Sequence, residues 1–123
     1  MNNIKTFENF NNKDIFTYIE NNDIKSVKNY IDSIYDLNIQ DGYNYTPLMY
    51  ASKNNNIEIV KLLLSAGADI NKQDNNDDTA LIKASRYDNI EIVKLLLNAG
   101  ADINKQNYYG DTALIKAAYY NRI

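Results

Sequence analysis

The chain has 123 residues, a formal net charge of −3 and no cysteine, histidine or tryptophan. These numbers predict one modest domain and exclude a disulfide framework, thiolate metal sites and catalysis built on Cys or His. The acidic balance also argues against non-specific nucleic-acid binding. Two residue types are in excess, with 21 Asn and 11 Tyr against three Phe.

The chain begins with an N-terminal arm, 1–11, that lacks the apolar run of a secretory signal peptide. Its Phe7 and Phe10 are candidates to cover the exposed end of the domain. The longest strongly apolar stretch, 57–64, is interrupted by charges and is much shorter than the ~20 residues of a membrane helix. We expect a cytoplasmic protein with no membrane partner, and secretion by a route without such a signal is also compatible with the sequence.

A period of 33 residues organises the rest of the chain. The block 41–73 aligns without gaps on 74–106, with 22 identical positions. A truncated third copy occupies 107–123, and a degenerate N-terminal copy occupies 12–40. These segments predict a single domain of about three and a half stacked repeats.

Each repeat is predicted to contain two short helices. Thr46, Thr79 and Thr112 precede the first helices, and a threonine hydroxyl is well suited to cap a helix N-terminus. The first helices are expected at 47–53, 80–86 and 113–119. Their small residues let the first helices of neighbouring repeats approach closely.

The second helices follow Asp23, Asn56 and Asn89, which are also predicted N-caps. They are expected to end at Gly67 and Gly100 in a left-handed C-cap. Their inner stripe is predicted to contain Ile57, Val60, Leu63 and Leu64, with Ile59 and Leu62 on other faces. A helix this short and this apolar is stable only when it is buried between neighbours.

The period, the Thr-Pro-Leu start at Thr46 and the run from Glu58 to Asn71 closely resemble the ankyrin repeat. The resemblance is strong over 41–123 and weak over 12–40. It implies an all-α ankyrin-repeat solenoid of stacked helix-turn-helix units with β-hairpin-like loops. It also implies a protein-binding scaffold without enzymatic activity, whose members generally bind through the loop tips and the concave face of the first helices.

The chain departs from the family pattern at its histidine and at two of its glycines. The usual histidine is replaced by Met49, Ile82 and Ile115, so we expect an apolar contact there. The loop-tip glycine is kept only at Gly110. At the other tips and between the helices, Asn44, Asn55, Asp77, Asp88 and Asn121 replace glycine. Asn and Asp are the residues other than glycine that best tolerate left-handed backbone.

The acidic residues allow a catalytic or metal-binding interpretation beside a structural one. Asp41, Asp69, Asp74 and Asp102 recur once per repeat, which favours hydrogen bonds within turns. The acidic run 74–78 lacks the ligand spacing, glycine and distal glutamate of a calcium loop. We therefore predict no enzyme, no bound metal and no cofactor.

The tyrosines gather where ankyrin proteins vary and bind. The predicted protein-binding residues are Tyr43, Tyr45, Lys53, Asn54, Asn75, Asn76, Asp78, Arg86, Tyr87, Tyr108, Tyr109, Asp111, Tyr119 and Tyr120. Tyrosine and asparagine combine rigid contact area with adaptable hydrogen bonds, as in many recognition surfaces. An AT-rich genome would also place Asn, Lys and Tyr at unconstrained surface positions, and the two explanations are compatible.

The sequence thus predicts a chain that binds another protein, of unspecified identity. The alternative is a structural or regulatory segment of a longer ankyrin-repeat protein with no ligand of its own. The last repeat stops at Ile123, so the side of Ala117 and Ala118 is expected to be partly uncovered. A fragment of a longer array, a frayed end and an end covered by another chain all explain this. We expect a monomer unless this end self-associates.

Overall fold

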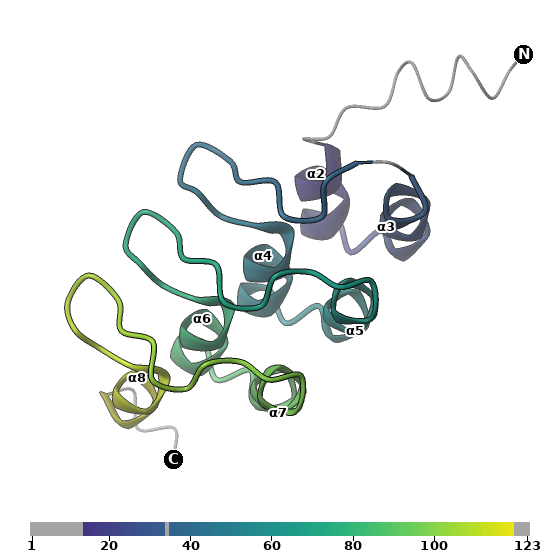
Figure 1. Cartoon of the computed structure of the whole chain (residues 1–123). Coiled ribbons are helices and arrows are strands. Elements are labelled where there is room, and N and C mark those ends of the chain that lie inside the picture. The colour runs from purple at the N-terminus through teal and green to yellow at the C-terminus, as the bar shows by residue number, and fades with distance from the viewer. Residues whose placement is uncertain (1–13, 34, 120–123) are drawn as a thin grey trace, which may run out of the picture.

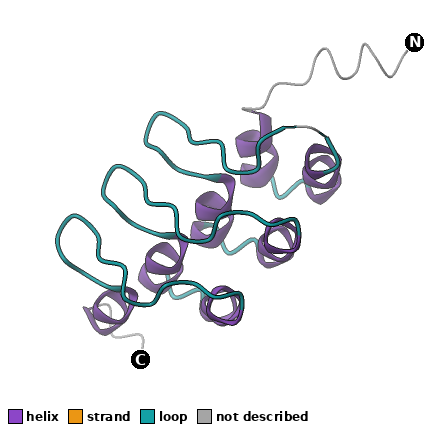
Figure 2. Ribbon diagram, in the orientation of Figure 1, coloured by secondary structure: helices purple, strands orange, loops and turns teal. Residues whose placement is uncertain are grey.

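The computed structural model describes residues 14–33 and 35–119, which form a stack of helix pairs (Figure 1). The helices are α2 (Asp14–Glu20), α3 (Ile24–Ile31), α4 (Pro47–Lys53), α5 (Ile57–Ser65), α6 (Ala80–Arg86), α7 (Ile90–Asn98) and α8 (Ala113–Tyr119). In these described ranges the segments between helices are loops and turns, without strands (Figure 2). The predicted ranges of the first helices are confirmed at α4, α6 and α8.

The helices form two rows (Figure 1). The first helices α2, α4, α6 and α8 stack in one row, and the second helices α3, α5 and α7 stack beside them. The loops that precede α4, α6 and α8 project from the first row on the side away from the second row. This is the predicted all-α solenoid, and its hairpin-like loops lie side by side along one edge of the stack.

The threonine caps are confirmed. Thr46 and Thr79 each accept a hydrogen bond from the backbone N–H three residues later at 3.2 Å, and Thr112 does so at 3.3 Å. Asp23 caps α3 in the same way, with a 3.2 Å bond from the N–H of Ser26. Each cap satisfies one of the N–H groups that the first turn of a helix leaves without a partner.

The asparagine caps are wrong in one respect. Asn56 and Asn89 stand at the N-cap positions of α5 and α7, but their side chains make no capping bond. The amide of Asn89 instead donates to the carbonyls of Ser52, at 2.6 Å, and Lys53, at 3.1 Å. These carbonyls belong to the last turn of α4, where a helix lacks internal donors. The amide therefore links consecutive repeats, which a carboxylate without N–H groups could not do.

The predicted left-handed residues are confirmed within the described ranges. The φ angles are 61° at Asn44, 59° at Asn55, 59° at Asp77 and 61° at Asp88. Gly67, Gly100 and Gly110 also have positive φ, and Asn22 adds an equivalent residue in the first repeat. Asn121 lies outside the described residues. Asparagine and aspartate thus replace the family's glycines at little steric cost.

The repeated aspartates have the turn role that the sequence predicts. The carboxylate of Asp74 accepts from the N–H groups two and four residues later, both at 2.9 Å. Asp41 does the same at 2.9 and 3.0 Å. Asp69 and Asp102 each accept from the N–H two residues later, at 3.1 and 2.9 Å. These bonds fix the loops without the help of a ligand.

Asparagine also forms a ladder along the stack. The side-chain oxygen of Asn38 accepts from the N–H of Asp69 at 2.7 Å, and that of Asn71 accepts from the N–H of Asp102 at 2.8 Å. Donor and acceptor belong to consecutive repeats. Part of the asparagine excess therefore has a structural origin that surface composition alone does not explain.

The core is continuous along the stack. Ile59, Val60 and Leu63 of α5 are fully buried, whereas Ile57 and Leu64 are only partly buried. The predicted stripe is therefore rotated toward Ile59, because α5 packs against α4 and also lies between α3 and α7. A helix with neighbours on several sides buries a broader face than one that covers a single surface.

The residues that replace the family's histidine are buried or exposed according to their position in the stack. Met49 and Ile82 are each 1% exposed, so an apolar contact does take the place of the histidine there. Ile115 is 47% exposed because no described element packs beyond α8. At the same end Ala117 is partly buried and Ala118 is exposed, as expected of an uncovered end.

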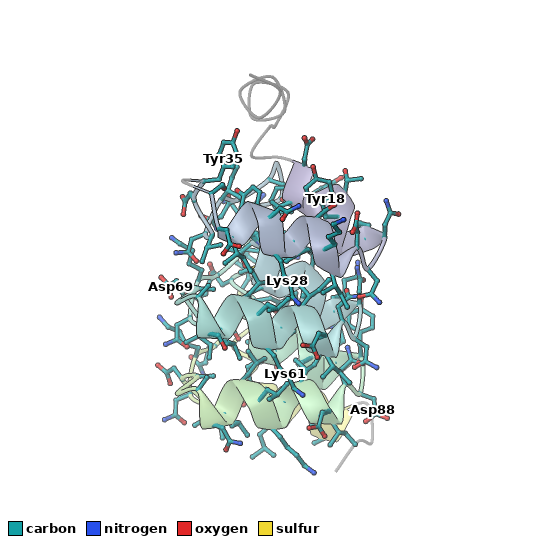
Figure 3. All side chains as sticks on the ribbon, turned by 90° about the vertical axis from the view of Figure 1, so that its right-hand side faces the viewer. Tyr18, Lys28, Tyr35, Lys61, Asp69 and Asp88 are labelled. Carbon is teal, nitrogen blue, oxygen red and sulfur yellow. The ribbon has the colours of Figure 1, made fainter. Side chains whose placement is uncertain are left out.

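The outer face of the second helices is charged. Lys28 of α3 and Lys61 of α5 hold equivalent positions and point away from the stack (Figure 3). Lys94 of α7 is also exposed. The longest described helices, α5 and α7, have nine residues each, and no described helix could cross a membrane.

Candidate binding surface

Tyrosines stand at the tips of two projecting loops. Tyr43 is 69% exposed, Tyr108 is 73% exposed and Tyr109 is 72% exposed. The rings of Tyr108 and Tyr109 meet edge to face with their centroids 5.4 Å apart. The backbone below them is fixed, because Asn107 accepts hydrogen bonds from the N–H groups of Tyr109 and Asp111, each at 2.9 Å. The stack therefore presents these rings to solvent on rigid loops.

The tips are joined to one another through the middle loop. The N–H of Asn75 donates to the carbonyl of Tyr43 at 3.1 Å, and the N–H of Tyr108 donates to the carbonyl of Asn76 at 2.7 Å. The side chain of Asn44 also donates to that of Asn75 at 2.7 Å. The side chains of Asn75 and Asn76 are exposed. The three tips therefore form one connected edge.

A mixed aromatic and cationic cluster lies below the first tip. The ammonium of Lys53 is 5.9 Å from the ring centroids of both Tyr45 and Tyr87. Tyr87 is 46% exposed, whereas Tyr45 is partly buried against the core. Asn54, the next residue, is exposed and donates to the carboxylate of Glu20 at 3.0 Å. The first-helix face thus offers one cation between two rings, a geometry that favours cation–π attraction.

Asp78 does not belong to the exposed surface, and that prediction is corrected here. Its side chain is 1% exposed and accepts from the guanidinium of Arg86 at 2.8 Å and from the amide of Asn107 at 3.0 Å. The carboxylate is buried because these two donors come from α6 and from the next loop. Arg86 keeps about a fifth of its side chain exposed, at 22%.

Sequence reasoning missed Lys83, the most buried cation in the described part of the chain. Lys83 is 1% exposed, and its ammonium lies 2.7 Å from the carboxylate of Asp74 and 3.7 Å from that of Asp78. The same ammonium lies 3.8 Å from the ring centroid of Tyr45. Together with Arg86, which pairs with Asp78, Lys83 forms a network in which two positive charges neutralise the two carboxylates of Asp74 and Asp78.

The equivalent positions in the neighbouring repeats offer the signal that could have revealed this cluster. Tyr50 replaces Lys83 one repeat earlier, and its hydroxyl donates to Asp41, the counterpart of Asp74. Burial and this hydrogen bond raise the pKa of Tyr50. Lys116, one repeat later, lies 3.1 Å from Asp111. In α4, α6 and α8 the fourth residue of the helix is therefore polar and contacts an aspartate of the preceding loop, so the same contact between helix and loop is repeated along the stack.

Two predicted residues, Tyr119 and Tyr120, cannot be assigned to the surface from the described side chains. Tyr119 is the last residue of α8, and its side chain is not among those described. Tyr120 lies outside the described residues. Asp111 is partly exposed and paired with Lys116.

The comparison with protein families decides the classification. A family model of ankyrin repeats, with three copies, matches residues 15–107 and again 76–123. The chain belongs to the ankyrin-repeat family. A comparison with curated proteins gave no match. Ankyrin repeats are generally modules for interaction between proteins.

The ankyrin surface described above presents mainly aromatic and polar groups to solvent. Among residues 14–33 and 35–119, no group of three or more acidic side chains is arranged to hold a metal ion. The strongest charges are neutralised in pairs beneath the surface. What reaches solvent is mainly aromatic area and amide groups, together with the ammonium of Lys53 and part of the Arg86 side chain, and aromatic and arginine side chains are enriched at protein interfaces.

Proposed function

We propose that the chain binds another protein through its loop tips and the concave first-helix face, and that it catalyses no reaction. The observation that carries the proposal is the exposure of Tyr43, Tyr108 and Tyr109, at 69%, 73% and 72%. A tyrosine ring buries ~150–250 Å² when it is covered and is enriched at protein interfaces. Three such rings on one edge provide a large contact area that the fold itself does not use.

The rigidity of the edge supports the same proposal. The backbone bonds between Asn75 and Tyr43 and between Tyr108 and Asn76 hold the three tips together before any partner arrives. Binding then orders fewer side chains and less backbone, which lowers the entropic cost of association.

The first-helix face extends the contact area. Lys53, Asn54, Arg86 and Tyr87 all keep part of their side chains in solvent. We propose these residues as a polar margin to the aromatic tips, whereas Asp78 acts from below by holding Arg86 in place. A polar margin around aromatic anchors is the usual organisation of a protein interface.

Affinity enrichment followed by quantitative mass spectrometry tests the proposal. The bait is the full chain, compared with a variant that combines Tyr43→Ala, Tyr108→Ala and Tyr109→Ala. Loss of several aromatic anchors should weaken capture of the specific partner at least about tenfold. The matched control combines Lys28→Ala, Lys61→Ala and Lys94→Ala. These residues lie on the outer face of the second helices, on the side of the stack away from the loop tips, so this variant should capture as much partner as the original chain.

Circular dichroism establishes that both variants are folded. Equal capture by the original chain and the tyrosine variant would contradict binding through the tips. That result would favour the second candidate, a structural or regulatory segment of a longer protein with no ligand of its own.

A further inference from the structure

In the described part of the chain the first helices contain four cationic side chains, and three of them are paired with a carboxylate. The paired cations are Lys83, Arg86 and Lys116, which lie 2.7, 2.8 and 3.1 Å from a carboxylate oxygen. The fourth is Lys53, the last residue of α4. No carboxylate among residues 14–33 and 35–119 lies within 4.0 Å of its ammonium. In these ranges Lys53 is therefore the one first-helix cation without an anionic partner.

The equivalent positions in the neighbouring repeats sharpen this contrast. Lys53 ends its helix, as Glu20 ends α2 and Arg86 ends α6. Glu20 accepts a hydrogen bond from the amide of Asn54 at 3.0 Å, and Arg86 donates to the carboxylate of Asp78 at 2.8 Å. Both neighbouring charges are thus satisfied by a polar group of the chain, whereas Lys53 contacts aromatic rings.

The surroundings of Lys53 also differ from those of the lysines on the outer face. Its ammonium lies 5.9 Å from the ring centroids of both Tyr45 and Tyr87, and its side chain is partly buried. Lys61 of α5, by contrast, is exposed to water. A ring face attracts a positive charge but is not a strong hydrogen-bond acceptor. The three N–H donors of the Lys53 ammonium are therefore positioned by the rings and available to an acceptor.

We propose that the partner bound by the first-helix face carries an acidic side chain, whose carboxylate pairs with Lys53 between Tyr45 and Tyr87. The inference rests on the proposed function, because it names the chemistry of the partner at the same surface. A carboxylate is the group that pairs with the other three first-helix cations. The rings limit the access of water to the pair, which strengthens the attraction between the charges.

A nucleic-acid phosphate fits this position less well than a carboxylate of a protein. Binding to a phosphate backbone depends on several cations at once. Here one unpaired lysine stands on the first-helix face of a chain whose net charge is −3. The partner is therefore an acidic segment of a protein.

Selection from a phage library of random linear peptides tests the proposal. The full chain is the target, with Lys53→Gln as the variant and Lys61→Gln on the outer face as the matched control. Both changes remove one ammonium from a helix, and circular dichroism establishes that both variants are folded. We expect peptides enriched on the original chain and on Lys61→Gln to contain an excess of Asp and Glu, and those enriched on Lys53→Gln to lack it.

A double-mutant cycle then joins the peptide carboxylate to Lys53. An enriched peptide is labelled with fluorescein, and its affinity is measured by anisotropy before and after its acidic residue is changed to the amide. Lys53→Gln should weaken binding of the acidic peptide at least about fivefold and should not weaken the amide peptide further. Charge reversal provides a rescue, because Lys53→Glu should recover affinity for a peptide whose acidic residue is changed to lysine.

Two results would overturn the acidic contact alone. These are enriched peptides without an acidic excess, or independent effects of the two changes in the cycle, when the same peptides still lose binding to the variant with Tyr43→Ala, Tyr108→Ala and Tyr109→Ala. Peptides that bind that tyrosine variant and Lys53→Gln as well as the original chain would contradict the proposed function together with the acidic contact. Failure to enrich any peptide on the full chain would count against both.

Discussion

Helices α6 and α8 have nearly the same sequence and very different surroundings. Both begin Ala-Leu-Ile-Lys-Ala, at Ala80 and at Ala113. In α6 the leucine, isoleucine and lysine are 2%, 1% and 1% exposed. In α8 the leucine is 60% exposed and the isoleucine is 47% exposed. The comparison shows that position in the stack, more than local sequence, decides what a residue contributes to stability.

The largest expected contrast concerns the two lysines. Lys83→Met keeps most of the length of the side chain but leaves the carboxylate of Asp74 buried without its cation, so we expect a loss of ~3–5 kcal/mol. Lys116→Met removes a partly exposed ion pair and should cost only ~0–1 kcal/mol. Urea unfolding followed by circular dichroism measures both. Similar losses for the two variants would break the contrast between α6 and α8.

A double variant sharpens this result. Asp74→Asn together with Lys83→Met removes both members of the buried pair, and the next loop already has asparagine at the equivalent position, Asn107. We expect the double variant to be more stable than Lys83→Met alone, because no buried charge is then left unpaired. A double variant no more stable than the single one would argue against the ion pair as the cause.

The leucines should differ almost as much. Leu81→Ala removes a buried side chain and should destabilise the fold by ~2–5 kcal/mol. Leu114→Ala removes a side chain that is already mostly in solvent and should cost less than about 1 kcal/mol. The free energies of unfolding from urea titrations provide the comparison. An equal loss at both positions would mean that the end of the stack is covered in solution.

The caps should show a smaller contrast. Thr79→Ala removes the N-cap of a helix packed on both sides and should cost ~1–2 kcal/mol, whereas Thr112→Ala should cost about 0.5 kcal/mol. Melting temperatures of the two variants at the same protein concentration measure the difference. A greater loss at Thr112 would contradict the weaker coupling that we assign to α8.

At the α3 end of the stack, the dependence of stability on pH tests how well Tyr30 is buried. Tyr30 of α3 is fully buried, its hydroxyl donates to the carbonyl of Asp36 at 2.9 Å, and burial raises its pKa to about 12. The neutral form is the one that the fold favours. The corresponding stability is complete below the ordinary tyrosine pKa of about 10 and is lost as the pH rises toward 12.

Tyr30→Phe cannot ionise, so its free energy of unfolding should fall less steeply between pH 10 and pH 12 than that of the original chain. Urea titrations across this interval measure the two slopes. Parallel slopes would show that Tyr30 is already accessible to hydroxide in the fold, and that the α3 end is as open as the α8 end.

The sequence predicted the helices and turns of this chain closely because three copies repeat the same local signals. The threonine caps, the helix at 47–53 and the left-handed Asn44 and Asp77 each depend on residues a few positions apart. Local rules of capping and turn geometry are sufficient for such features.

Features that depend on contacts between repeats were predicted poorly. Asp78 seemed a surface residue, because nothing in its own loop shows that Arg86 and Asn107 approach it. Lysine is usually exposed on a helix surface, so the sequence of α6 alone gives no sign that Lys83 is buried. Its burial follows from the packing of neighbouring repeats around it. The amides of Asn56 and Asn89 likewise satisfy groups in the preceding repeat instead of their own helix.

The two backbone bonds that connect the loop tips have a consequence for how this surface can change. They join main-chain atoms of Tyr43 to Asn75 and of Asn76 to Tyr108, so they do not depend on which side chains those positions carry. Substitutions at the tips can therefore accumulate without loosening the edge. A lineage could exchange one set of contacts for another by drift at a few codons, while the scaffold beneath stays the same.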